Sequence, residues 1–145
     1  MKKRILSIFL CLVMVFSLLP FTASAASAIP INEETFPDPV FREYVRKVAG
    51  SSVLTDTIVR QIEALDVSKD NIKKVLGDRD PITSLMGIRY LRYVKDLNCS
   101  GQELKKTLNL EQNSRVEKLN CSGNQLTGLW FHKGSSLKYL TCSVN

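Results

Sequence analysis

Residues 119–126 read LNCSGNQL, a near copy of LNCSGQEL at 97–104, and a shortened third copy, LTCSVN, stands at 140–145. Aligning Cys99, Cys121 and Cys142 sets the copies 22 and 21 residues apart. The same offsets superimpose apolar residues outside the quoted stretch, namely Val94, Val116 and Leu137. A fixed period of this length is typical of chains that wind into stacked turns.

The shared frame, L-x-C-x-x-N-x-L, is the leucine-rich-repeat signature. Leu119 and Cys121 are two residues apart, so in a strand both enter the core while Lys118 and Asn120 face outward. Stacked units then form a parallel sheet. Asn124 follows where the chain turns away, and its amide can satisfy backbone groups that the tight coil buries. Gln102 replaces it in the first clear repeat, where we expect a loosened turn.

The repeat extends upstream with two irregularities. The stretch ITSLMGIRYLRYVKDL at 82–97 keeps the apolar spacing of a turn. Before it, ALDVSKDNI at 64–72 resembles half a unit, with Leu65, Val67 and Ile72 in the strand frame. The spacing is too long between these two stretches, so KKVLGDRD at 73–80 is interpreted as an insertion.

Two helical patterns precede the repeats. In PDPVFREYVRKVAG at 37–50, apolar residues recur at helical spacing, with Asp38 as cap, Pro39 in the first turn and Gly50 beyond the end. TDTIVRQIEAL at 55–65 repeats the pattern, with Thr55 or Asp56 as N-cap. The predicted fold is α/β: a helical cap at 29–64 followed by a short solenoid at 65–145 with a parallel sheet on its concave face.

The first 28 residues have the order of a secretory signal: three cations, an apolar run and a small-residue tail. Its removal takes Lys2, Lys3 and Arg4 and leaves 17 basic against 14 acidic residues, a net charge of +3. That mild, dispersed excess argues against nucleic acid as a partner. The sequence predicts a secreted or cell-surface protein without a transmembrane segment in its mature chain.

These motifs resemble the bacterial secreted leucine-rich-repeat proteins of the internalin-like kind, over residues 36–145. FPDPVFREYV at 36–45 looks like the opening of the cap, and LNCSGNQLTGL at 119–129 like the turn unit. The resemblance implies binding of proteins or other surface ligands through the concave sheet. Many such proteins carry further repeats and wall-attachment regions, which residues 1–145 lack.

The cysteines allow several interpretations. Neighbouring strands lie close enough for a disulfide, but parallel side chains that enter a packed interior favour reduced, buried thiols. A metal site would need C-x-x-C loops and a fourth ligand, and neither is present. The single histidine, His132, has no nucleophile or second histidine beside it. We therefore expect no metal, no cofactor and no enzymatic activity.

Alternation along the strands predicts which residues share the concave face. They are polar and able to form hydrogen bonds, which suits a protein or glycan ligand. The alternative is a structural, envelope-associated piece without a specific ligand. The predicted face, called the concave face below, consists of Asp96, Asn98, Ser100, Lys118, Asn120, Ser122, Tyr139, Thr141 and Ser143.

The last strand, YLTCSVN at 139–145, has no following turn in this sequence to cover Leu140 and Cys142. Solenoids normally finish with a cap that hides such a surface. The sequence therefore predicts either a piece of a longer repeat protein or end-to-end self-association through this strand.

Overall fold

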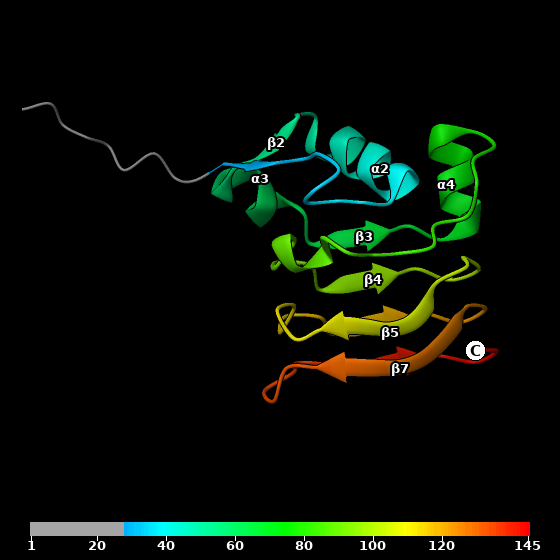
Figure 1. Ribbon diagram of the computed structural model, residues 1–145. Helices are drawn as coiled ribbons and strands as arrows, with labels where there is room; N and C mark the ends of the chain where they lie inside the picture. The colour runs from blue at the N-terminus through cyan, green and yellow to red at the C-terminus, as the bar shows by residue number, and fades with distance from the viewer. Residues whose placement is uncertain (1–27) are drawn as a thin grey trace, which may run out of the picture.

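The computed structural model describes residues 28–145, which form a cap followed by a stacked coil (Figure 1). The predicted signal segment lies almost entirely outside the described residues. None of the helices formed by residues 28–145 combines the length and apolar character that a membrane span requires. The cap contains β1 (Ile29–Pro30), α2 (Pro39–Ala49), β2 (Val53–Leu54) and α3 (Asp56–Gln61), and β1 pairs antiparallel with β2.

Helix α2 begins and ends where its sequence predicts. Asp38 caps it by accepting hydrogen bonds from the N–H groups of Val40 (3.1 Å) and Phe41 (2.9 Å). Pro39 occupies the first turn, and Gly50 ends the helix in a left-handed conformation with φ of 60°. Helix α3 begins after Thr55, whose hydroxyl is the N-cap. It ends at Gln61, earlier than the apolar pattern suggested.

The predicted parallel sheet is confirmed, and it has four strands. Strands β3 (Ala64–Asp66), β4 (Asp96–Asn98), β6 (Lys118–Asn120) and β8 (Tyr139–Thr141) lie in the order β3-β4-β6-β8. Their register aligns Leu65, Leu97, Leu119 and Leu140. The first three of these leucines are buried. The half-unit at 64–72 therefore supplies a complete strand.

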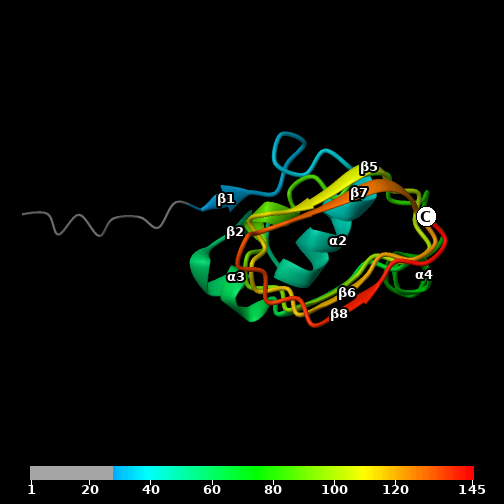
Figure 2. The same ribbon diagram turned by 90° about the horizontal axis from the view of Figure 1, so that it is seen from below.

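A second parallel pair, which the sequence analysis did not predict, lies on the opposite side of the coil (Figure 2). It consists of β5 (Lys105–Leu110) and β7 (Gln125–Phe131). Leu108 and Leu110 point inward from β5 and are buried. The core is thus packed between the two sheets, and the cap covers its first turn.

The first half of the apparent insertion at 73–80 is the end of a helix. Strand β3 leads directly into α4 (Lys69–Leu76), with Ser68 as its N-cap. Ile72 lies in this helix and is buried there, so its assignment to a strand frame was wrong. Helix α4 places eight residues where the other repeats have a short turn. This explains why the spacing between the stretches at 64–72 and 82–97 is longer than the repeat predicts. The remaining turns are tighter, with a 3-10 helix, η2, at Ile88–Tyr90.

Gln102 does not loosen its turn, contrary to the prediction. Its side chain is buried, accepts a hydrogen bond from Ile82 N–H (2.8 Å) and donates one to the Val67 carbonyl (2.7 Å). Asn124 makes equivalent bonds one turn later, accepting from Leu104 N–H at 3.1 Å. Glutamine supplies the same amide on a longer side chain, so it can perform the same role.

Asp38 also joins the cap to the coil. Its Oδ2 accepts hydrogen bonds from the N–H groups of Thr83 (2.9 Å) and Ser84 (3.3 Å) and from the Thr83 hydroxyl (3.1 Å). The same carboxylate caps α2 through Oδ1. One buried side chain therefore fixes the helix and the first turn of the coil relative to each other.

Candidate ligand-binding face

The register of the four-stranded sheet brings Asp96, Lys118 and Tyr139 into one exposed row across β4, β6 and β8. The side chain of Lys118 is 59% exposed and that of Asp96 53% exposed, and Tyr139 is 64% exposed. Lys118 Nζ lies 3.8 Å from Asp96 Oδ2, a long and solvated ion pair. These three side chains are available to a ligand.

Two further rows of the concave face are partly used by the coil itself. Asn98 Oδ1 accepts hydrogen bonds from Ser100 N–H (3.2 Å) and Ser100 Oγ (2.8 Å). Asn120 Oδ1 accepts the same pair from Ser122, at 3.2 and 2.9 Å. All four residues are half-buried. Their oxygens stabilise the end of each strand, so less of each side chain remains for a ligand.

The third turn is the most exposed part of the face. Thr141 and Ser143 are exposed, and the Ser143 hydroxyl lies 3.4 Å from that of Ser122. The structure therefore places all nine predicted residues on one face, where they fall into two groups. The row formed by Asp96, Lys118 and Tyr139 is free, whereas the asparagine–serine pairs also have structural roles.

The sequence analysis missed Asp66, which the register places beside Asn98. Asp66 Oδ1 accepts a hydrogen bond from Ser68 N–H (3.0 Å), as Asn98 does from Ser100. The sequence does contain a pattern that predicts this residue, because LDVS at 65–68 aligns with LNCS at 97–100 and 119–122. A repeated Leu-polar-x-Ser pattern thus predicts one more strand of this face than cysteine alignment alone.

Alternating charges line the edge of the sheet where the strands begin. Lys95 Nζ donates to Glu63 Oε2 (2.9 Å), and Lys138 Nζ donates to Glu117 Oε2 (2.8 Å). The bond to Lys138 lowers the pKa of Glu117, and the same bond raises the pKa of Lys138. Opposite charges in consecutive turns favour the observed stacking register over a shifted one.

Beside that edge, three arginines surround Tyr93. The guanidinium carbons of Arg115, Arg60 and Arg92 lie 4.6, 5.0 and 5.9 Å from the ring centroid. Asp56 pairs with Arg60 (2.6 Å) and Arg92 (3.0 Å), and these two hydrogen bonds lower its pKa. This cluster joins the cap to two turns of the coil, and sequence spacing gave no sign of it.

The three cysteines of residues 28–145 are free thiols, and they differ in exposure. Cys99 and Cys121 are buried, as predicted for core positions. Burial is the main cause that raises the pKa of Cys99 and of Cys121. Cys142 is exposed, so its assignment to a core position was wrong for residues 28–145.

Other chemically capable residues do not gather into a centre. Among residues 28–145, no three His, Cys, Asp or Glu side chains lie close enough together to hold a metal ion. His132 is exposed in the loop after β7, and its Nδ1 accepts a hydrogen bond from Gly134 N–H (3.0 Å). Trp130 is exposed on β7, on the side opposite the concave face.

Comparison with known proteins places the fold. No protein-family model and no curated protein matches the chain. Among solved structures, the functional domain of InlJ from Listeria monocytogenes, described as including a cysteine ladder, matches with a TM-score of 0.62 and 25% identity. The match covers 81% of this chain and 24% of the InlJ domain.

Internalin C2 from Listeria monocytogenes also matches, with a TM-score of 0.54 and 23% identity over 68% of this chain and 41% of that protein. This chain thus spans less than half the length of either protein. Both matches cover a larger share of this chain than the repeats at 65–145 alone. The chain therefore has the fold of the internalin-like leucine-rich-repeat domains.

Proposed function

We propose that this chain is a secreted or surface-associated module that binds a protein or a glycan through its concave face. The observation that carries the proposal is the exposed row of Asp96, Lys118 and Tyr139, which the register holds on adjacent strands. None of the three is needed to fill the core. The cap and coil thus present a rigid sheet whose outer side chains are free for a partner.

The chemistry of the row suits recognition of a polar partner. Tyr139 offers an aromatic ring and a hydroxyl, a combination enriched where interfaces hold most of their binding energy. Lys118 is held by Asp96 only across 3.8 Å in solvent, so an acidic group on a ligand can replace that contact at little cost. The half-buried Asn98 and Asn120 amides add donors in a neighbouring row, two residues further along β4 and β6.

Export supports the same proposal. The cations, apolar run and small residues of the first 28 positions have the order of a secretory signal. Repeat proteins of this architecture use their extended concave surfaces for binding. Fractionation distinguishes the binding module from an envelope-associated structural piece, because the latter stays with the envelope without a saturable ligand.

The experiment pairs two double variants that are matched in chemistry. Lys118→Glu with Tyr139→Ala alters the concave face, and Lys133→Glu with Trp130→Ala makes an equivalent change on or next to β7. A screen of host and bacterial surface proteins and glycans supplies the ligand. We expect the first variant to weaken binding about tenfold or more and the second to leave it unchanged.

Both variants should keep their thermal midpoint, because exposed substitutions change stability by about 0.5 kcal/mol or less. Equal binding by the wild type and the concave-face variant would remove this face from the function. A large fall in the melting temperature of that variant would instead identify Lys118 and Tyr139 as structural residues.

A further inference from the structure

Within residues 28–145, strand β5 is paired on one side only. Its partner is β7, and the two form a two-stranded sheet. In the repeat alignment Ile82 corresponds to Leu104, so residues 83–88 correspond to β5 itself, one turn earlier. A strand at 83–88 would therefore lie beside β5, on the side opposite β7. The structure has turns and the start of η2 there instead. An edge of β5 is therefore left without a strand in the middle of the coil.

The cap explains why residues 83–88 do not pair with β5. Asp38 accepts hydrogen bonds from Thr83 and Ser84, which holds the start of this segment against α2. Gly87 has φ of 104°, and a Cβ there would lie 2.5 Å from the Phe36 ring. Only glycine fits this close approach at positive φ. The segment is thus bound to the cap rather than to the sheet.

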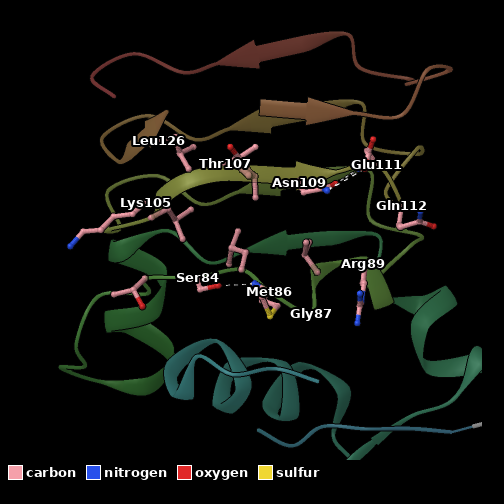
Figure 3. Close-up of a pocket in the computed structure, with 15 residues that line it drawn as sticks. Ser84, Met86, Gly87, Arg89, Lys105, Thr107, Asn109, Glu111, Gln112 and Leu126 are labelled. Carbon is pink, nitrogen blue, oxygen red and sulfur yellow. Dashed lines mark hydrogen bonds between the residues drawn. The ribbon is translucent and has the colours of Figure 1, made fainter. Parts of the chain in front are cut away.

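A groove separates the two segments as a result. Glu103 N–H donates to the Ile82 carbonyl (3.1 Å), and within residues 28–145 no further backbone hydrogen bond joins 83–89 to β5. Beyond that bond lies a cavity of about 400 Å³. Figure 3 shows Lys105, Thr107 and Asn109 along one wall of this groove and Ser84, Met86 and Gly87 along the other.

The walls of the groove combine apolar side chains with unpaired cations. Leu85, Leu104 and Leu108 line it and are otherwise buried, and Met86 at the opposite wall is 63% exposed. Lys105 is exposed and has no salt bridge within residues 28–145. Glu111, at the other end, accepts a hydrogen bond from Asn109. The groove therefore has an excess of positive charge at the Lys105 end.

We propose that this groove binds an extended acidic peptide segment, which adds to the free edge of β5 as a third strand. Alternate N–H and C=O groups along a strand edge are satisfied by another extended backbone, which carries the complementary groups at the same spacing. Every second side chain of that peptide then enters the groove beside the exposed Met86, above the buried Leu85, Leu104 and Leu108. The intervening side chains face outward, where a carboxylate meets Lys105.

The bulge in β5 limits the length of the added strand. Lys106 has φ of 62°, and the pairing with β7 shifts between Lys106 and Thr107. A bulge interrupts the regular edge. The regular part that remains, from Thr107 to Leu110, therefore accepts a short segment, with its acidic end placed beside Lys105.

The probe is the peptide acetyl-Asp-Val-Thr-Val-Asp-amide, which has acidic groups at both ends and so does not depend on strand direction. Titration into isotopically labelled protein should shift the amide resonances of Thr107–Leu110 and of residues 84–89 saturably. Two variants of this peptide test the backbone contact. One carries N-methyl groups on the backbone nitrogens of both valines, and the other carries them on those of both aspartates and the threonine. Successive N–H groups of an extended peptide point to opposite edges, so only one of the two sets of N–H groups faces β5. The peptide with that set methylated should bind about tenfold more weakly, and the other peptide should bind as the unmethylated probe does.

Charge reversal tests the acidic preference independently of the fold. Lys105→Glu should weaken the acidic probe about tenfold and favour acetyl-Lys-Val-Thr-Val-Lys-amide instead. Lys74→Glu, an exposed substitution on α4 away from the groove, is the matched control and should change neither affinity.

Several outcomes would overturn the proposal. They are the absence of saturable shifts up to about 5 mM peptide, shifts confined to the four-stranded sheet, and equal effects of both N-methylated peptides. The concave-face variant Lys118→Glu with Tyr139→Ala should bind the probe normally. The groove and the concave face can therefore succeed or fail separately.

Discussion

At the scale of single residues, a column of buried amides holds the turns together. Asn124 Nδ2 donates to the carbonyls of Cys99 and Cys121, both at 2.9 Å, while its Oδ1 accepts from Leu104. Asn145 repeats the arrangement, donating to the Cys121 and Cys142 carbonyls at 3.1 and 3.0 Å. Each amide satisfies backbone groups of two turns; those bonded to Asn124 lie in the core, whereas Asn145 is exposed.

Asn124→Ala should therefore destabilise the protein strongly. It leaves the buried Leu104 N–H and the Cys99 carbonyl without partners, while the Cys121 carbonyl keeps its hydrogen bond from Asn145, and we expect the free energy of unfolding to fall by about 3 kcal/mol. Gln125→Ala, an exposed neighbour, should change it by about 0.5 kcal/mol or less. Urea unfolding of both variants measures the difference, and equal effects would contradict the structural role of the amide.

Cys99 makes stability depend on pH in the alkaline range. Burial raises its pKa in the folded state, whereas an unfolded thiol ionises near pH 8.5. Above that pH the unfolded chain binds fewer protons than the folded one, so the free energy of unfolding falls as pH rises. The slope is about 0.7 kcal/mol per pH unit at pH 8.5 and approaches about 1.4 kcal/mol per pH unit near pH 10.

Cys99→Ala should reduce this slope by that amount, as measured by urea unfolding at several pH values. The range is kept below the ordinary pKa of tyrosine, because burial also raises the pKa of Tyr44, which adds its own loss at higher pH. An unchanged slope in the variant would mean that Cys99 ionises in the folded protein.

At the scale of elements, the junction of cap and coil depends on the N-cap of α2. Asp38 is buried and serves the helix through one oxygen and the segment at 83–84 through the other. The cap is thereby fixed against the first turn, and β5 loses the neighbour that the repeat would provide. The hydrogen bonds of Asp38 therefore both stabilise the cap and leave the groove open beside β5.

Asp38→Ala should cost about 3 kcal/mol in the free energy of unfolding, since it removes both the cap and the link to Thr83. Thr55→Ala removes the N-cap hydrogen bond of α3 (3.3 Å) but no side-chain link between the cap and the coil. It should lower the free energy of unfolding by about 1 kcal/mol. Hydrogen exchange at the Thr83 amide should accelerate only in the Asp38 variant. Similar losses in both variants would show that Asp38 acts as a helix cap alone.

At the scale of the whole molecule, the sheet ends in an exposed strand. Leu140 is 45% exposed on β8, although its equivalents in β3, β4 and β6 are buried. The outer edge of β8 has no partner among residues 28–145. Such an edge can pair with another chain.

We expect the chain of residues 29–145 to self-associate through β8, with the cap at the other end favouring dimers over longer assemblies. Leu140→Lys should reduce this association by placing a charge in the contact. Light scattering over a range of concentrations provides the measurement. A monomer at high micromolar concentration, with a sharp cooperative melt, would show that the exposed edge is tolerated.

Much of this architecture can be predicted from local patterns. The capping residues Asp38 and Gly50 define α2 because caps act within a few residues, and the 21- to 22-residue period predicts the parallel sheet. The concave row follows from strand alternation around Leu97 and Leu119. The helical end of the half-unit at 64–72 did not follow, because a short apolar stretch fits a strand or a helix equally.

The sequence by itself determined the stacked turns, the inward leucines and cysteines, and the polar outer row, because each depends on spacing along the chain. Only the tertiary structure decided that Gln102 makes the hydrogen bonds of the asparagine that it replaces and that Asp38 holds the segment at 83–84. It also decided that three arginines gather at Tyr93 and that β5 keeps a free edge. These features join residues far apart in sequence, so their distances and partners depend on how the cap packs against the coil.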